Sequence, residues 1–183
     1  KYKEFIRRFP TFKKLSQARL KSVLKTWQGL GYNRRARYLQ QIAQKVTREC
    51  KGRLPHDSEV LETFPGIGEA TACSIVTFAC NKPTVFIETN IRTVFIHEFF
   101  KSKKSVGDKD IVPLVKQTLP SKNYREWYYA LMDYGVMLKK KYPNPSRKST
   151  HHTKQTPFKG SDREIRGIIL KLLPHKNILS KKQ

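Results

Sequence analysis

The sequence predicts an all-α protein, and three observations carry that prediction. Apolar residues recur at helical spacing along most of the 183 residues. Pro65-Gly66 separates two helical stretches, because proline disrupts a helix interior and glycine tolerates a tight turn. Residues 84–87 read locally as a strand, but no partner strand is evident, so we expect a buried connector. This length suffices for one or two compact lobes.

The first half of the chain is expected to form four helices. Ser16 is expected to cap the first, whose apolar residues continue to Trp27 at core spacing. Gly29-Leu30-Gly31 then breaks the pattern. The helices after this break are expected over 34–50, from Asp57-Ser58 to Phe64, and over 69–79.

The second half is also expected to be helical, over 89–100, 108–119 and 124–140. Composition changes near Lys139. Residues 139–160 are polar, basic and proline-bearing, which predicts a long loop that is either a nucleic-acid contact or disordered. A last amphipathic helix is expected over 161–173, with its apolar face formed by Ile165, Ile168, Ile169 and Leu172.

The charge balance predicts a polyanionic partner. The chain has 38 Lys and Arg against 14 Asp and Glu, a net charge of +24. Nucleic acid is the first candidate and an anionic membrane surface the second, but no apolar run approaches the ~20 residues that span a bilayer. No signal peptide is evident, so we expect an intracellular protein of the cytoplasm or nucleoid, or of a eukaryotic nucleus. Because the chain begins with Lys1 rather than Met, we expect a fragment without its true N-terminus.

Candidate metal ligands are few. Cys50, Cys73 and Cys80 form no CxxC pair, and the last two lie on one apolar helical stretch, which favours core positions and a reducing compartment. His151-His152 lies in a polar stretch without helical ligand spacing or companion carboxylates. We therefore expect no metal site built from side chains.

Residues 61–72 form the most informative motif. Their pattern predicts two helices joined by a hairpin, with Gly66 and Gly68 at the start of the second helix. The unpaired N–H groups and positive dipole of that helix end would attract a phosphate, and glycine lets it approach the backbone. Such a hairpin grips a nucleic-acid backbone without reading its sequence. The alternative is an ordinary helical hairpin with a glycine cap.

A second candidate site lies at Glu88, between an apolar run and a helix. The helix dipole would stabilise its carboxylate, which could offset positive charge that develops on a sugar of bound DNA. The alternative is an acid that only caps the helix.

A third candidate lies over residues 27–37. Tyr32 follows a glycine break and precedes Arg34, Arg35 and Arg37, an arrangement that suits a wedge into stacked bases with cations on the phosphates. The alternative is a helix–helix corner with Trp27 in the core. We expect both in part, with Trp27 buried and Tyr32 near the DNA.

These motifs belong to a longer collinear series: Phe5-Ile6-Arg7-Arg8-Phe9-Pro10, Trp27-Gln28-Gly29-Leu30-Gly31-Tyr32, Arg35-Ala36-Arg37, Leu61 to Gly68, Thr71-Ala72, Asn90, and Met132 to Met137. The series resembles the helix-hairpin-helix DNA glycosylase superfamily, and most closely its MutY-type adenine DNA glycosylases. The resemblance implies a two-lobed all-α fold with a DNA-binding cleft between the lobes. The lobes are expected over 1–90, a six-helix barrel that contains the hairpin and lacks its N-terminal part, and over 91–183, where the basic loop 139–160 replaces an iron–sulfur loop.

The resemblance also implies a chemistry. Such enzymes flip the target nucleotide out of the duplex and cleave its N-glycosidic bond. Glu88 aligns with the family's sugar-stabilising aspartate and Asn90 with its active-site asparagine. The extra methylene of Glu88 alters a geometry to which rates are sensitive. The family's general-acid glutamate and wedge glutamine belong to an opening helix that these residues do not contain.

Two other departures from the family pattern predict the loss of strand cleavage and of the iron–sulfur cluster. Ala70 stands where bifunctional relatives place a Schiff-base lysine, so we expect base removal without strand cleavage. Lys139 stands near the place of the first iron–sulfur cysteine and residues 143–159 contain no cysteine, so we expect no cluster. The last lobe is then expected to be held by packing through Phe158 and the 161–173 helix.

The leading prediction is a monofunctional DNA glycosylase of base excision repair that acts on adenine in a mispair. The alternatives are a glycosylase for mismatched thymine or uracil or for damaged purines, and a non-catalytic lesion-binding protein. We expect a monomer on double-stranded DNA, with no membrane partner. Beyond Tyr32 and its arginines, the expected phosphate contacts are Gly66, Gly68, Ala70, Thr71 and Arg92, and a structural Na⁺ or K⁺ is expected on backbone groups of Phe64 and Gly66.

Overall fold

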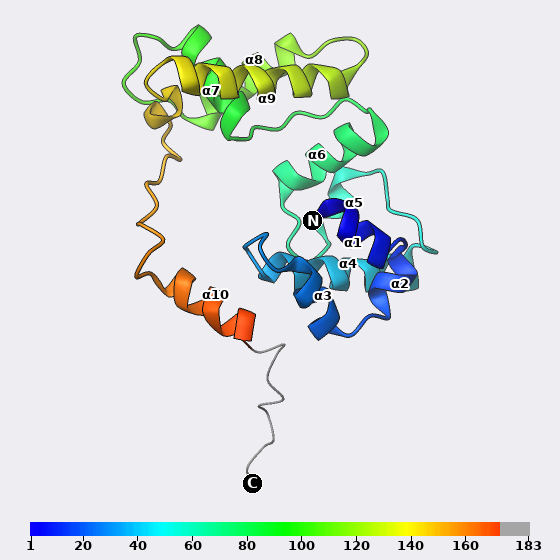
Figure 1. Ribbon diagram of the computed structural model, residues 1–183. Helices are drawn as coiled ribbons and strands as arrows, with labels where there is room; N and C mark the ends of the chain where they lie inside the picture. The colour runs from blue at the N-terminus through cyan, green and yellow to red at the C-terminus, as the bar shows by residue number, and fades with distance from the viewer. Residues whose placement is uncertain (173–183) are drawn as a thin grey trace. The chain divides into compact units, whose positions relative to one another are not determined.

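A computed structural model describes residues 1–172, and their regular structure is helical (Figure 1), so the predicted all-α class is confirmed. The elements are α1 (Tyr2–Arg8), α2 (Phe12–Ser16), α3 (Leu20–Trp27), α4 (Arg34–Glu49), α5 (Ser58–Glu62), α6 (Glu69–Cys80), α7 (Thr89–Phe99), α8 (Asp108–Thr118), α9 (Tyr124–Lys141), the 3₁₀ turn η1 (Pro145–Lys148) and α10 (Asp162–Leu172).

The chain divides into two compact units. Unit 1 comprises Lys1–Pro55, Phe64–Gly66 and a segment that begins at Gln155, and unit 2 comprises His56–Thr63 and Ile67–Lys154. The lobe boundary expected near residue 90 and the cleft expected between the lobes stay predictions.

Unit 1 is built on α4, against which α2 and α3 pack (Figure 1). Its core contains Phe5, Leu15, Val23 and Ala43. Ser16 was expected to begin a helix, and this expectation is wrong. Ser16 ends α2, with its hydroxyl donating to the Lys13 carbonyl, and Arg19 stands at the N-cap of α3.

Unit 2 is centred on α7, which packs along α9 and also contacts α8 and η1 (Figure 1). Phe95 and Tyr128 are nearly or fully buried between these elements. The expected buried connector is confirmed. Phe86 is buried and stacks on Tyr128 with ring centroids 4.2 Å apart, and the Tyr128 hydroxyl donates to the Thr84 carbonyl at 2.8 Å.

The stretch between α9 and α10 is a loop, as predicted, but it contains the 3₁₀ turn η1, which was not predicted. Asn144 Oδ1 accepts the Ser146 N–H at 3.1 Å and thereby starts η1. The Val106 N–H then donates to the Lys148 carbonyl, and the Thr150 N–H to the Val106 carbonyl. Pairing with a segment some 40 residues earlier in the chain cannot be read from local composition.

The last predicted helix is confirmed as α10, but its predicted packing is wrong. Phe158 and the apolar residues of α10 are exposed: Ile165, Ile168, Ile169 and Leu172. Among the described helices, none is both long enough and apolar enough to cross a membrane.

Candidate active site

Glu88 stands at the N-cap of α7 and is half-buried. Its Oε1 accepts the backbone N–H groups of Asn90 at 2.6 Å and Ile91 at 2.9 Å. The positive end of the α7 dipole also attracts the carboxylate. The capping role considered from the sequence is therefore real, and it fixes the carboxylate at a helix end without excluding the catalytic role.

Asn90 links this carboxylate to a cation on another helix. Its Nδ2 donates to Glu88 Oε2 at 3.4 Å, and its Oδ1 accepts from Lys139 Nζ of α9 at 2.6 Å. Burial lowers the pKa of Lys139, and the Glu88 carboxylate opposes this shift. The structure thus joins the two predicted catalytic residues and adds Lys139, which the sequence analysis had noted only for standing near the place of the first iron–sulfur cysteine.

Gly135 allows α9 to reach Asn90. A Cβ on Gly135 would lie 2.4 Å from the Asn90 carbonyl oxygen and 2.8 Å from the Asn90 Cβ. Any larger residue would force the two helices apart, because both atoms belong to ordered helix. Gly135 therefore determines how closely α9 approaches the candidate site, a role that the sequence analysis missed.

The helical hairpin forms as predicted. Asp57 caps α5 through Oδ1, which accepts the Glu59 N–H at 2.8 Å, and Gly68 stands at the N-cap of α6. Gly66 has a φ of +74°, which favours glycine, and a Cβ there would lie 2.1 Å from the Tyr38 ring. The residues predicted to meet phosphate in this hairpin are all exposed: Gly66, Gly68, Ala70 and Thr71.

Tyr32 projects from unit 1 with 69% of its surface exposed, and the Arg35 guanidinium lies 5.1 Å from its ring centroid. Arg34 and Arg37 are also exposed. Trp27 is half-buried, packs edge-on against Phe5, and donates from Nε1 to the Gly31 carbonyl at 2.9 Å. This bond shapes the loop that presents Tyr32, whose contact with DNA stays a prediction.

Arg92 is held differently from the other predicted DNA contacts. Its Nε and Nη2 each donate to an Asp108 carboxylate oxygen at 2.8 Å, and its side chain is 14% exposed. The Arg92 bond lowers the pKa of Asp108, and His151 lies on the far side with Nε2 3.5 Å from Asp108 Oδ2. This bidentate pair joins α7 to α8, so the guanidinium is already occupied, and its contact with phosphate stays a prediction.

The profile of the family described as HhH-GPD superfamily base excision DNA repair protein matches residues 1–180. The chain belongs to this family. It is 31% identical over 141 residues to the adenine DNA glycosylase of Buchnera aphidicola subsp. Baizongia pistaciae, covering 75% of this chain and 39% of that protein.

Two further relatives of this HhH-GPD chain differ from each other in the base that their names specify. The human adenine DNA glycosylase is 36% identical over 119 residues, 64% of this chain and 21% of that protein. The thymine/uracil-DNA glycosylase of Pyrobaculum aerophilum is 32% identical over 140 residues, 73% of this chain and 61% of that protein. The predicted family resemblance is therefore confirmed, and the chain spans about two fifths of the length of the Buchnera enzymes, at 39% and 40%.

Solved structures agree on the fold. A thermostable thymine-DNA glycosylase superposes with a TM-score of 0.70 at 21% identity, covering 80% of this chain and 69% of that one. Endonuclease III in a non-covalent DNA complex gives a TM-score of 0.60 at 17% identity, covering 96% of this chain and 76% of that one. At these identities the likeness shows the HhH-GPD glycosylase fold alone.

The donor set of this HhH-GPD chain does not fit a four-cysteine iron–sulfur cluster. Such a cluster needs four thiolates, and the chain has three cysteines, of which Cys73 is buried in the core of unit 2. Within residues 1–172, no group of three or more His, Cys, Asp or Glu side chains could hold a metal ion.

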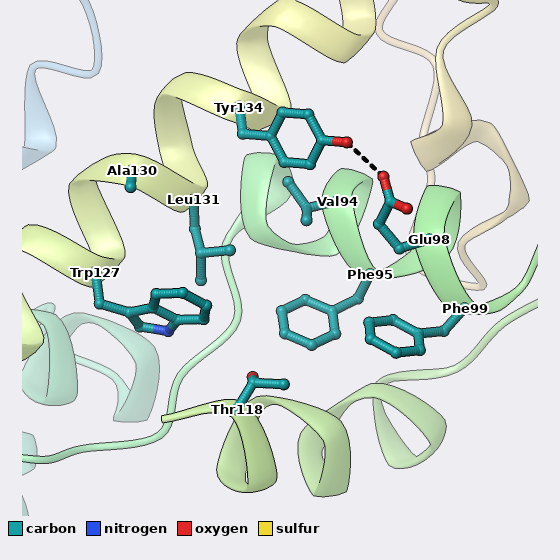
Figure 2. A pocket seen from close by; sticks show the side chains of 9 residues that line it. All are labelled: Val94, Phe95, Glu98, Phe99, Thr118, Trp127, Ala130, Leu131 and Tyr134. Carbon is teal, nitrogen blue, oxygen red and sulfur yellow. Dashed lines mark hydrogen bonds between the residues drawn. The ribbon is translucent and has the colours of Figure 1, made fainter. Parts of the chain in front are cut away.

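One pocket of unit 2 lies apart from the predicted residues. It has a volume of about 390 Å³ and is lined almost entirely by apolar side chains of α7 and α9, with Thr118 from α8. Figure 2 shows the Tyr134 hydroxyl reaching Glu98 at its rim, where the bond measures 2.5 Å, and the rings of Phe95, Phe99 and Trp127 around it. Neither Glu88 nor Asn90 lines this pocket, and it offers few polar atoms to recognise a nucleobase.

Proposed function

We propose that this protein is a monofunctional DNA glycosylase in which Glu88 is the sugar-side carboxylate. The observation that carries the proposal is the carboxylate at the α7 N-terminus, bonded to Asn90 and linked through it to Lys139. As the N-glycosidic bond breaks, the deoxyribose becomes electron-deficient. A carboxylate held by three donors is oriented in advance to stabilise that charge, with little reorganisation during the reaction.

The DNA would be held by two sets of groups. The exposed backbone at Gly66, Gly68 and Ala70 would bind phosphate in the manner of helix N-termini, with Thr71 beside it. The exposed Arg34, Arg35 and Arg37 would bind the backbone, while Tyr32 would wedge beside the flipped nucleotide. We further propose that the protein acts as a monomer and that a Na⁺ or K⁺ on backbone groups of Phe64 and Gly66 supports the hairpin.

Adenine in a mispair is the proposed substrate, because several relatives of similar sequence are adenine DNA glycosylases. The second candidate is thymine or uracil opposite guanine, and it is supported by the Pyrobaculum aerophilum relative. A panel of duplexes, each with one candidate base, separates these substrates, because base removal leaves an alkali-labile site. Strand cleavage should require alkali, since Ala70 supplies no amine. A borohydride-trapped protein–DNA adduct would contradict this.

The decisive variant is Glu88→Gln in the full-length protein. It keeps the hydrogen-bonding shape but removes the charge, so the single-turnover rate of base release should fall by about 10²–10³ or more. Binding to duplex DNA should stay close to that of the wild type. Glu126→Gln is the matched control, because Glu126 is an exposed acid on α9. An unchanged rate in Glu88→Gln would remove Glu88 from the mechanism.

A non-catalytic protein that recognises lesions is the remaining alternative. It is favoured by the glutamate at position 88, since its longer side chain alters the carboxylate position. Retention of salt-sensitive DNA binding with no release of any base from the whole panel would support that alternative over the enzyme.

A further inference from the structure

We propose that Lys139 is a positioning residue that orients Asn90 and, through it, the Glu88 carboxylate. The proposal rests on the function proposed for Glu88. It concerns an additional residue, which contributes a charge and a hydrogen bond from a different helix. Lys139 lies 49 residues from Asn90 in sequence, and its Nζ donates to Asn90 Oδ1 at 2.6 Å.

Helix α9 contacts Asn90 at two residues. Gly135 lies against the Asn90 backbone so closely that no Cβ fits. Lys139 follows four residues later, which places it on the same face of α9. The glycine sets the distance between the helices, and the lysine then bonds to the side chain of the same residue. Two contacts from one helix face to the same residue hold Asn90 more specifically than a single bond from a surface lysine would.

The bond from Lys139 fixes the direction of the Asn90 side-chain amide. Its oxygen accepts from the ammonium, so its NH₂ group must face Glu88 Oε2, 3.4 Å away. Without the ammonium, the amide could rotate and turn its oxygen toward the carboxylate, which would be repulsive. Glu88 has one more rotatable bond than an aspartate, so the loss of a donor would leave its outer oxygen poorly fixed.

Lys139 also brings a positive charge close to the Glu88 carboxylate, with which it has a favourable electrostatic interaction. Arg92 is paired with Asp108 of α8, and His151 faces the same aspartate. At the other end of α7, Glu98 bonds to His97 and to Tyr134 of α9. Removal of Lys139 should therefore alter the electrostatic environment of Glu88 in particular.

The test compares Lys139→Met with Lys140→Met in the full-length protein. Both variants remove one positive charge from α9, but Lys140 is exposed. Lys139→Met should lower the single-turnover rate of base release by about 10–100-fold, because a small displacement of a reacting group costs that much. Affinity for an uncleavable duplex should change less than about twofold, and Lys139→Arg should recover part of the rate.

Rates of base release that coincide for Lys139→Met and Lys140→Met would overturn the inference. So would a slow Lys139→Met enzyme whose rate is not partly recovered in Lys139→Arg, because a purely structural role would give that result. If Lys139→Met does not fold, Lys139→Leu carries the same test, since it also removes both the donor and the charge. Failure here is distinct from failure of the proposed function. If Glu88→Gln is inactive while Lys139→Met behaves like wild type, only the role of Lys139 is lost.

Discussion

Glu88 caps a helix, the role that the sequence offered as the alternative to a catalytic one, but the cap uses only one of its carboxylate oxygens. It caps α7 through two backbone N–H groups, and its second oxygen remains bonded only to the Asn90 side chain among the described hydrogen bonds. A carboxylate can accept from several donors, so capping by one oxygen leaves the other able to face a substrate. The local pattern at residues 88–92 therefore predicted the position of the group correctly, and its chemical role stays a matter for the Glu88→Gln experiment.

Tyr128 is buried, and its ionisation should lower the free energy of unfolding at alkaline pH. Burial raises the pKa of Tyr128 to about 12 from an ordinary 10.0. The folded state thus holds this proton more tightly than the unfolded state, so the stabilisation is complete below pH 10.0 and is lost as the pH rises toward 12. Urea unfolding at about pH 8 and about pH 11.5 should show a loss of about 2 kcal/mol from this group.

Tyr128→Phe should show a smaller alkaline loss than the wild type. At about pH 8 it should be less stable than the wild type, because the Thr84 carbonyl loses its donor. Tyr129→Phe is the control, since Tyr129 is 46% exposed and should keep the wild-type pH dependence. Equal alkaline slopes for wild type and Tyr128→Phe would show that Tyr128 does not contribute.

At the level of helices, the contact between α7 and α9 is the one that builds the candidate site. It depends on Gly135, so Gly135→Ala should lower the free energy of unfolding by about 1–3 kcal/mol through overpacking against Asn90, even though alanine favours helix. Thermal or urea unfolding measures this loss. Gly167→Ala on α10 is the matched control, because a Cβ there meets nothing within 4 Å and should not destabilise the protein. Equal stability of the two variants would mean that α9 can move away without cost.

Helix positions were predictable where local chemistry decides them. Pro65-Gly66 predicted the turn of the hairpin, Asp57 predicted the start of α5, and the spacing of apolar residues predicted α4. The same reasoning misplaced the start of α3 at Ser16. Thr11 instead caps an earlier short helix, in which its Oγ1 accepts the Lys14 N–H at 3.2 Å. Five residues of helix leave too little periodicity to be recognised.

The candidate site was predictable only in its local part. Glu88 and Asn90 are two residues apart, so one motif contained both. Lys139 and Gly135 belong to another helix, and their contacts with Asn90 depend on how α9 packs against α7. No spacing rule along the chain encodes that packing. The bidentate bond of Arg92 to Asp108 was missed for the same reason, since the two residues lie on different helices.

For the molecule as a whole, charge should dominate DNA affinity. With a net charge of +24, binding to a duplex should weaken by at least about a hundredfold between 50 and 200 mM salt. Arg35→Gln should lower the slope of log affinity against log salt by about one, because one phosphate contact is lost. Titration of a labelled duplex at several salt concentrations measures this slope. Asp162→Asn, which alters an acid near the start of α10, should leave the slope unchanged. A slope near zero in the wild type would contradict backbone-driven binding.

The chain has two tryptophans, Trp27 and Trp127, and they fall in different compact units. One packs edge-on against Phe5 beside the Tyr32 loop, and the other lines the apolar pocket. The protein consequently contains a separate intrinsic fluorophore for each half. In each single variant, Trp27→Phe or Trp127→Phe, one indole remains, and its emission would report the unfolding of its own unit. Comparison of the two melting curves would reveal whether the two units unfold together.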